Sequence, residues 1–192
     1  MTIEKTKATD TVSSGLTCNT KAGEDAKATG VFHIICRDKD GNLKWEAESK
    51  NLVVNVGLQY MAGTALTSVA QTTSWFLGLY GAGASNTPAA GDTMSSHAGW
   101  TENTTYSNAT RVAATFATAT TANPSVVTNS ASPATFNING TTTIGGAFLT
   151  SGSAKGGTTG TLFSAADFGA PGDRSVVNSD TLAVTYTFSL AA

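Results

Sequence analysis

The chain has 192 residues with a formal net charge of −2, and 40% of its residues are hydrophobic. This length and composition suit one main globular domain, whereas the charge excludes the dense basic surface that nucleic-acid binding requires. No apolar run approaches the roughly 20 residues that span a bilayer, so neither nucleic acid nor membrane is an expected partner.

Residues 1–29 predict an extended N-terminal arm. They lack apolar periodicity and mix charged residues with Ser, Thr, Gly and Ala, which is equally compatible with a disordered tail. Leu16 is an isolated large hydrophobic residue and is the candidate contact of this arm. The first ten residues are charged where a signal peptide has its apolar core, so we expect synthesis in the cytoplasm and no disulfide between Cys18 and Cys36.

Residues 31–50 predict a β-hairpin that opens the β domain of residues 30–192. An apolar run is followed by the polar turn Lys39–Asn42 and then by an alternating strand. Gly41 supplies the positive φ of the turn. The alternation places Leu43, Trp45 and Ala47 on the buried face, with Glu46, Glu48 and Lys50 toward water.

A short helix is expected from about residue 56 to residue 66, because its apolar residues follow a helical spacing more closely than an alternating one. Asn55 is the candidate N-cap. Gly57 and Gly63 weaken the helix by up to about 1 kcal/mol each relative to Ala, so we expect tertiary packing to hold it.

Strand-like runs separated by turn residues fill the rest of the chain, from residue 75 to residue 190, with a Gly/Pro/Ser-rich loop at residues 82–99. This spacing predicts a mainly β, antiparallel sandwich or jelly-roll-like domain. The last strand, from Thr181, is the clearest. One of its faces is apolar and the other carries mostly Thr; the apolar residues are Leu182, Val184, Tyr186, Phe188 and Leu190.

The sequence offers few residues that could form a catalytic site. His97 lies in one loop with Ser95 and Asp92, but residues crowded into a single loop seldom reach triad geometry, and no nucleophile elbow is present. Glu102 and Asp92 are the one carboxylate pair in the β region that a glycoside hydrolase could use. We expect no catalytic residue and no cofactor.

Metal binding is also disfavoured. Asp38, Asp40 and Asn42 alternate as in a calcium loop, but the bidentate Glu expected downstream is missing, and a hairpin turn already explains these residues. We expect no metal site.

Aromatic residues around the long loop are candidate contacts. Trp100 and Tyr106 flank polar residues, and exposed aromatic faces suit either a glycan or a protein partner. With His97 and Leu16 they form the set of candidate protein or glycan contacts.

Three segments resemble a family of virion structural proteins of tailed bacteriophages. They are AAGDTMSSHAGW (residues 89–100), YSNATR (residues 106–111) and KGGTTGTL (residues 155–162), within a resemblance that spans about residues 43–190. The resemblance implies a β-rich particle protein without catalytic residues, either a capsid decoration (cement) protein or another head- or tail-associated component.

These observations together predict a protein that binds the outside of the assembled head, with the major capsid protein as its partner. A homo-oligomer is expected, with a trimer slightly favoured over a dimer. The alternative is a tail or head-fibre component that contacts the host surface through Trp100 and Tyr106.

Overall fold

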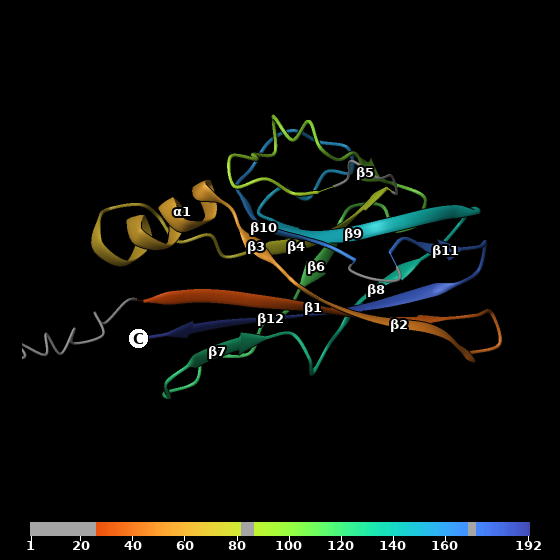
Figure 1. Ribbon diagram of the computed structural model, residues 1–192, viewed down its shortest axis with the longest axis horizontal. Coiled ribbons are helices and arrows are strands. Elements are labelled where there is room, and N and C mark those ends of the chain that lie inside the picture. Colours follow the sequence, from red (N-terminus) through yellow and green to blue (C-terminus); the bar gives the residue numbers. More distant parts are fainter. Residues whose placement is uncertain (1–25, 82–86, 169–171) are drawn as a thin grey trace, which may run out of the picture.

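The computed structural model describes residues 26–81, 87–168 and 172–192, which form a sandwich of two antiparallel sheets with one helix at its end (Figure 1). The predicted fold class, mainly β with one short helix, is confirmed. The elements are β1 (Lys27–Arg37), β2 (Leu43–Lys50), β3 (Leu52–Val53), α1 (Asn55–Leu66), β4 (Trp75–Gly81), β5 (Glu102–Asn103), β6 (Val112–Ala114), β7 (Ser125–Thr128), β8 (Ala134–Asn137), β9 (Thr142–Thr150), β10 (Leu162–Asp167), β11 (Arg174–Val176) and β12 (Thr181–Ala191).

The first sheet is built on the two longest strands, β1 and β12. Its order is β2-β1-β12-β7, and β8 also pairs with β12. Alternate side chains of β1 and β12 enter the core, because successive residues of a strand point to opposite faces. The buried ones are Phe32, Ile34, Cys36, Leu182, Val184 and Tyr186. The expected alternation of β12 therefore holds through Tyr186, but Leu190 is 42% exposed where the strand runs past the core.

The second sheet is covered on both faces. Its order is β3-β10-β9-β4-β5, with β11 on β9 and β6 on β4. One face joins the main core through Leu77, Leu79 and Leu149. The other face carries a smaller core around Phe148 and Trp100, over which the loops of residues 87–111 and 151–161 lie (Figure 1). This double coverage explains why β4 reads as a continuous apolar run instead of an alternating one.

The hairpin of β1 and β2 has the predicted turn, with Gly41 at φ +84°. Glu46, Glu48 and Lys50 are exposed as expected, whereas Trp45 is only half buried. The prediction that Leu43 is buried is wrong, because this residue is 55% exposed at the turn, beyond the reach of the core. The first strand begins at Lys27, inside the arm expected for residues 1–29. Leu16 and Cys18 lie outside the described residues.

The helix α1 ends at Leu66 as predicted, but its start differs. Asn55 is the first helical residue, and the N-cap is Val54, whose apolar side chain has no atom that could form a cap hydrogen bond. The Asn55 N–H instead donates to the carbonyl of Ala90 at 2.8 Å. The prediction of Asn55 as N-cap is therefore wrong, because a loop carbonyl satisfies the helix terminus.

Within the strand-like runs expected for residues 75–190, the segment after Trp100 forms two short strands, β5 and β6. Between them the chain turns at Tyr106, and beyond β6 it crosses from the second sheet to the first, where the Ala117 N–H donates to the carbonyl of Thr128. The short strands β3, β7 and β11 were not predicted, because runs of two to four residues give too little periodicity to detect.

Candidate protein-binding surface at the helix end of the sandwich

The loop residues considered for a catalytic triad are bonded to other partners. The Asp92 carboxylate accepts from the Trp100 indole N–H at 2.9 Å and from the Ala89 N–H at 2.9 Å. His97 Nδ1 lies 2.8 Å from the Trp100 carbonyl oxygen, and its ring stacks on the indole with centroids 3.9 Å apart. The Ser95 hydroxyl contacts that of Thr93. These contacts hold the loop in shape, and no nucleophile–base pair is formed among Asp92, Ser95 and His97.

The two carboxylates considered for glycoside hydrolysis, Glu102 and Asp92, are also bonded to different partners. Arg111 donates to both oxygens of Glu102, at 2.9 and 2.7 Å, and the Gly156 N–H donates to one of them at 2.7 Å. The Arg111 side chain is fully buried and that of Glu102 is 7% exposed. Glu102 therefore acts as the internal counter-ion of Arg111.

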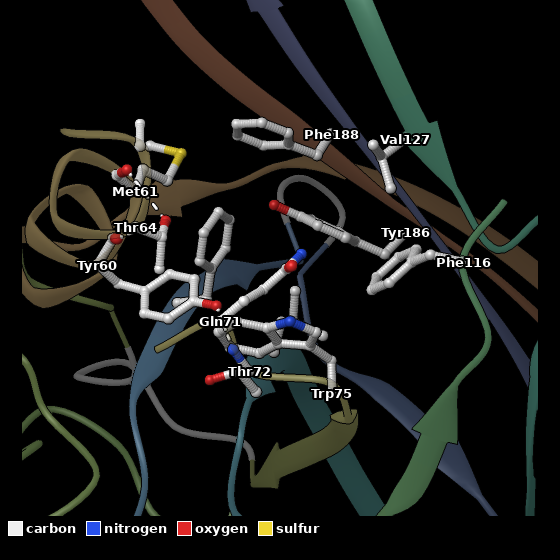
Figure 2. A pocket seen from close by; sticks show the side chains of 13 residues that line it. Tyr60, Met61, Thr64, Gln71, Thr72, Trp75, Phe116, Val127, Tyr186 and Phe188 are labelled. Atoms are coloured by element: carbon white, nitrogen blue, oxygen red, sulfur yellow. Dashed lines mark hydrogen bonds between the residues drawn. The ribbon is translucent and has the colours of Figure 1, made fainter. Parts of the chain in front are cut away.

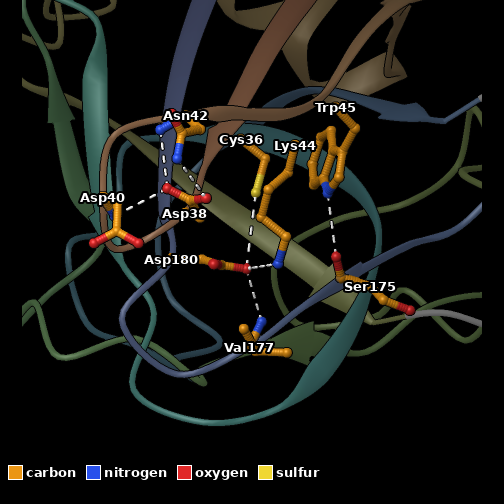
Figure 3. A network of polar contacts seen from close by, with 9 residues as sticks. All are labelled: Cys36, Asp38, Asp40, Asn42, Lys44, Trp45, Ser175, Val177 and Asp180. Carbon is orange, nitrogen blue, oxygen red and sulfur yellow. Dashed lines mark hydrogen bonds and ion pairs between the residues drawn. The ribbon is translucent and has the colours of Figure 1, made fainter.

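The alternating residues Asp38, Asp40 and Asn42 form the hairpin turn (Figure 3). Asp38 accepts from the side-chain and backbone N–H groups of Asn42 and from the Asp40 N–H, and these hydrogen bonds, that from the Asn42 side chain first, lower the pKa of its carboxyl. Asp40 pairs with Lys39. Within the described ranges, no three His, Cys, Asp or Glu side chains are grouped so that they could hold a metal ion.

A buried carboxylate ties the hairpin to the end of the sandwich far from α1 (Figures 1 and 3). Asp180 accepts from Lys44 Nζ at 2.5 Å and from the Val177 N–H at 2.8 Å, while Cys36 Sγ lies 3.9 Å away. The hydrogen bond to Asp180 raises the pKa of Lys44. Burial, together with the negative charge of Asp180, raises the pKa of the Cys36 thiol to about 11.

We expect Cys36 to resist alkylation in the folded protein. At about pH 8, a free thiol with the ordinary pKa is partly thiolate, whereas a buried thiol with a raised pKa stays neutral and shielded. Iodoacetamide followed by peptide mass analysis should leave Cys36 unmodified in buffer and alkylate it in denaturant. Equal rates in the two solutions would contradict the burial of this thiol.

The candidate contacts Trp100 and Tyr106 are not exposed. Trp100 is 3% exposed and packs against Tyr80 and Phe148 in the smaller core. Tyr106 is fully buried, with its ring edge-on to Phe136 and beneath the Lys155 ammonium. The expectation of open aromatic faces is wrong, because the loop that carries these residues folds over the second sheet. Of the described candidates, only His97 is partly exposed.

The surface that the sequence reasoning missed lies on α1. Leu66 is 86% exposed, Val69 just beyond the helix is 50% exposed and Leu58 is 44% exposed. We call these three residues the helix-end patch. No charged residue occurs between Lys50 and Asp92, so the surroundings of the patch carry no charge from this stretch. The available signal was that apolar residues surround α1, whereas a helix on a solvated surface is polar on one face.

A hollow of about 450 Å³ lies beside α1, where the two sheets separate (Figure 2). Its wall is largely aromatic: Tyr60 from α1, Trp75 from β4, and Tyr186 and Phe188 from β12. The Tyr60 ring meets Trp75 edge-on at 5.2 Å, and its hydroxyl accepts from the Thr72 N–H at 2.7 Å. The hollow is therefore a preformed, mainly apolar site, with Thr64, Gln71 and Thr72 among its polar lining.

Comparison of the chain with protein-family models, with curated proteins and with solved structures finds no match. In the described part of the chain, no helix has both the length and the apolar character needed to cross a membrane.

Proposed function

We propose that the protein is a structural component of a tailed-bacteriophage virion, a capsid decoration protein that binds the outside of the assembled head. The partner is the major capsid protein, and the protein acts as a homo-oligomer, with a trimer favoured over a dimer. The resemblance of residues 89–100, 106–111 and 155–162 to virion structural proteins motivates the particle assignment.

The helix-end patch is the observation that carries the proposal. Exposure of large apolar side chains to water is unfavourable, and exposed apolar surface on an uncharged helix is typical of protein-binding surfaces. Burying a fully exposed leucine side chain contributes about 1.5–3 kcal/mol. Leu66, which is 86% exposed, can supply most of this amount on binding, and Leu58, which is 44% exposed, a smaller part.

The mechanism is mass action. A protein that binds only the assembled shell stabilises that state, by about 2.7 kcal/mol per site when its free concentration is 100 times the Kd. Many symmetric copies add these contributions. The buried ion pair of Glu102 and Arg111 and the buried Asp180 serve the stability of the subunit itself.

The test is binding of the purified protein to particles that lack it. We expect the double variant Leu58→Asp/Leu66→Asp to bind at least about tenfold more weakly, because it loses apolar burial and places two charges in the contact. Leu43→Asp is the matched control. Leu43 is 55% exposed but lies at the hairpin turn, at the opposite end of the sandwich, so its replacement should leave binding unchanged (Figure 1).

Wild-type occupancy by the double variant, with its thermal unfolding unchanged, would refute binding through the helix-end patch. A loss of host adsorption without a loss of particle stability would instead favour the tail or head-fibre alternative. Sedimentation of the isolated protein tests the trimer.

A further inference from the structure

The aromatic hollow beside α1 continues into a longer groove. A second hollow, of about 950 Å³, adjoins it and shares Trp75, Phe116 and Val127 with it. Small residues line the second hollow on one side, in the run from Ala113 to Ala119. We call the two hollows together the arm groove. It has one aromatic end, and its other part is lined largely by Ala and Thr.

The shape of the arm groove favours an extended chain over a compact ligand. Its aromatic end offers room for one large apolar side chain, and the adjoining hollow gives the chain on either side of it a place to lie. Trp75, Phe116 and Phe188 at the aromatic end remain partly exposed, so an occupant would remove apolar surface from water. The residues lining the groove carry no charge, so the matching segment should carry none either.

Residues 13–18 of the arm have this pattern. The sequence SSGLTC places the single large residue Leu16 between small, uncharged neighbours. The charged residues nearest to this segment are Asp10 and Lys21, which leave the six residues free of charge.

The chain enters the sandwich next to the groove. Lys27 pairs with Ala191, and Phe188, which lines the aromatic end, lies three residues earlier on β12, about 10 Å along the strand. Leu16 precedes Lys27 by 11 residues, which span at most roughly 36–40 Å. The arm is therefore long enough to return to the groove of its own subunit. A short tether also gives the arm an effective concentration in the millimolar range, which no second copy matches in dilute solution.

We propose that residues 13–18 of the arm bind in the arm groove of the same chain, with the Leu16 side chain in the aromatic hollow. This proposal does not depend on the particle assignment, since it concerns the isolated protein. It gives Leu16 a specific partner within the fold.

A nitroxide on Cys18 tests the proposal in the full-length protein by paramagnetic broadening of its NMR signals. Cys36 is buried, with a raised pKa, and is expected to stay unlabelled. We expect the Trp75 indole and Thr72 amide signals to lose most of their intensity, while the Gly41 amide at the distant hairpin turn keeps its intensity. Leu16→Asp should restore the lost signals. Ile3→Asp, the matched control elsewhere in the arm, should not.

A mixed sample distinguishes an arm of the same chain from an arm of a neighbouring copy. In this sample the nitroxide is on protein without ¹⁵N, and the NMR signals come from ¹⁵N-enriched protein without nitroxide. Broadening in this mixture would show the arm of a neighbouring copy in the groove and overturn the proposal. Broadening in neither sample, or broadening that Leu16→Asp leaves in place, would also overturn it.

Proteolysis provides a second, independent measurement. Trypsin cleavage after Lys21 should be slower in the wild-type protein than in Leu16→Asp, and equally slow in Ile3→Asp. A groove variant, Thr64→Arg, should speed cleavage as Leu16→Asp does, because it brings a charged side chain into the aromatic hollow. Equal cleavage rates in all four proteins would refute the docking of the arm.

Discussion

Replacing Arg111 by Met is expected to lower the free energy of unfolding by about 3–5 kcal/mol, the cost typical of removing one partner of a buried ion pair. Arg111 is 1% exposed and binds both oxygens of Glu102. It also donates to the carbonyls of Gly152 and Gly157, each at 2.8 Å. The variant would leave a buried carboxylate without its counter-ion and two carbonyls without their donor. Urea denaturation followed by circular dichroism measures the change.

The double variant Arg111→Met/Glu102→Gln is the informative comparison. The neutral amide that replaces the Glu102 carboxylate removes the unpaired charge and can still accept from the Gly156 N–H, so part of the lost stability should return. Lys155→Met is the matched control for loss of a nearby cation. Among the residues that the structure describes, its ammonium contacts the Tyr106 carbonyl and ring, so the variant should be destabilised much less than Arg111→Met. Equal stability of the Arg111→Met single and double variants would show that the charge of Glu102 is not the source of the cost.

The three segments on which the particle assignment rests, residues 89–100, 106–111 and 155–162, meet in the loop layer over the second sheet. Asp92 and Trp100 come from the first segment, Arg111 ends the second and Gly157 belongs to the third. Arg111 also lies over the Phe148 ring at 5.3 Å. These residues of the three segments thus serve internal packing, and the exposed contacts proposed for this protein lie elsewhere, on α1.

Strand alternation was the part of the fold that the sequence could predict well. In β2 and β12 successive residues point to opposite faces of the sheet. The face on which a residue lies therefore follows from its position along the strand, without knowledge of distant segments. The hairpin turn was equally local, because Gly41 needs only its own backbone conformation. The bounds of β1 and α1 came within a few residues for the same reason.

Burial by distant segments could not be predicted in this way. Trp100 has polar neighbours in sequence, yet Tyr80 and Phe148 from β4 and β9 bury it. From the sequence alone Arg111 would be placed on the surface, but in the structure Glu102 and two glycine carbonyls surround its side chain. The exposed patch on α1 was missed for the converse reason, since apolar residues at helical spacing suggested only a buried face.

Gly57→Ala is expected to destabilise the protein by about 1–3 kcal/mol, as overpacked sites do, although Ala is the better helix former. A Cβ at position 57 would lie 2.2 Å from the backbone oxygen of Phe163 on β10. That oxygen accepts from the Val54 N–H at 3.2 Å, so it cannot move without breaking the entry to α1. The sequence interpretation of Gly57 as a weak point is therefore reversed, because its missing side chain lets α1 approach the sheet.

Gly63→Ala provides the matched control in the same helix. Its added Cβ would meet Val69 Cγ2 at 3.0 Å, and Val69 is a half-exposed side chain that can rotate away. We expect this variant to be neutral or stabilised by up to about 1 kcal/mol, through helix propensity and the reduced freedom of the unfolded chain. The unfolding temperature of Gly57→Ala should therefore fall, whereas that of Gly63→Ala should rise or stay unchanged. Equal shifts would mean that α1 does not depend on its close approach to β10.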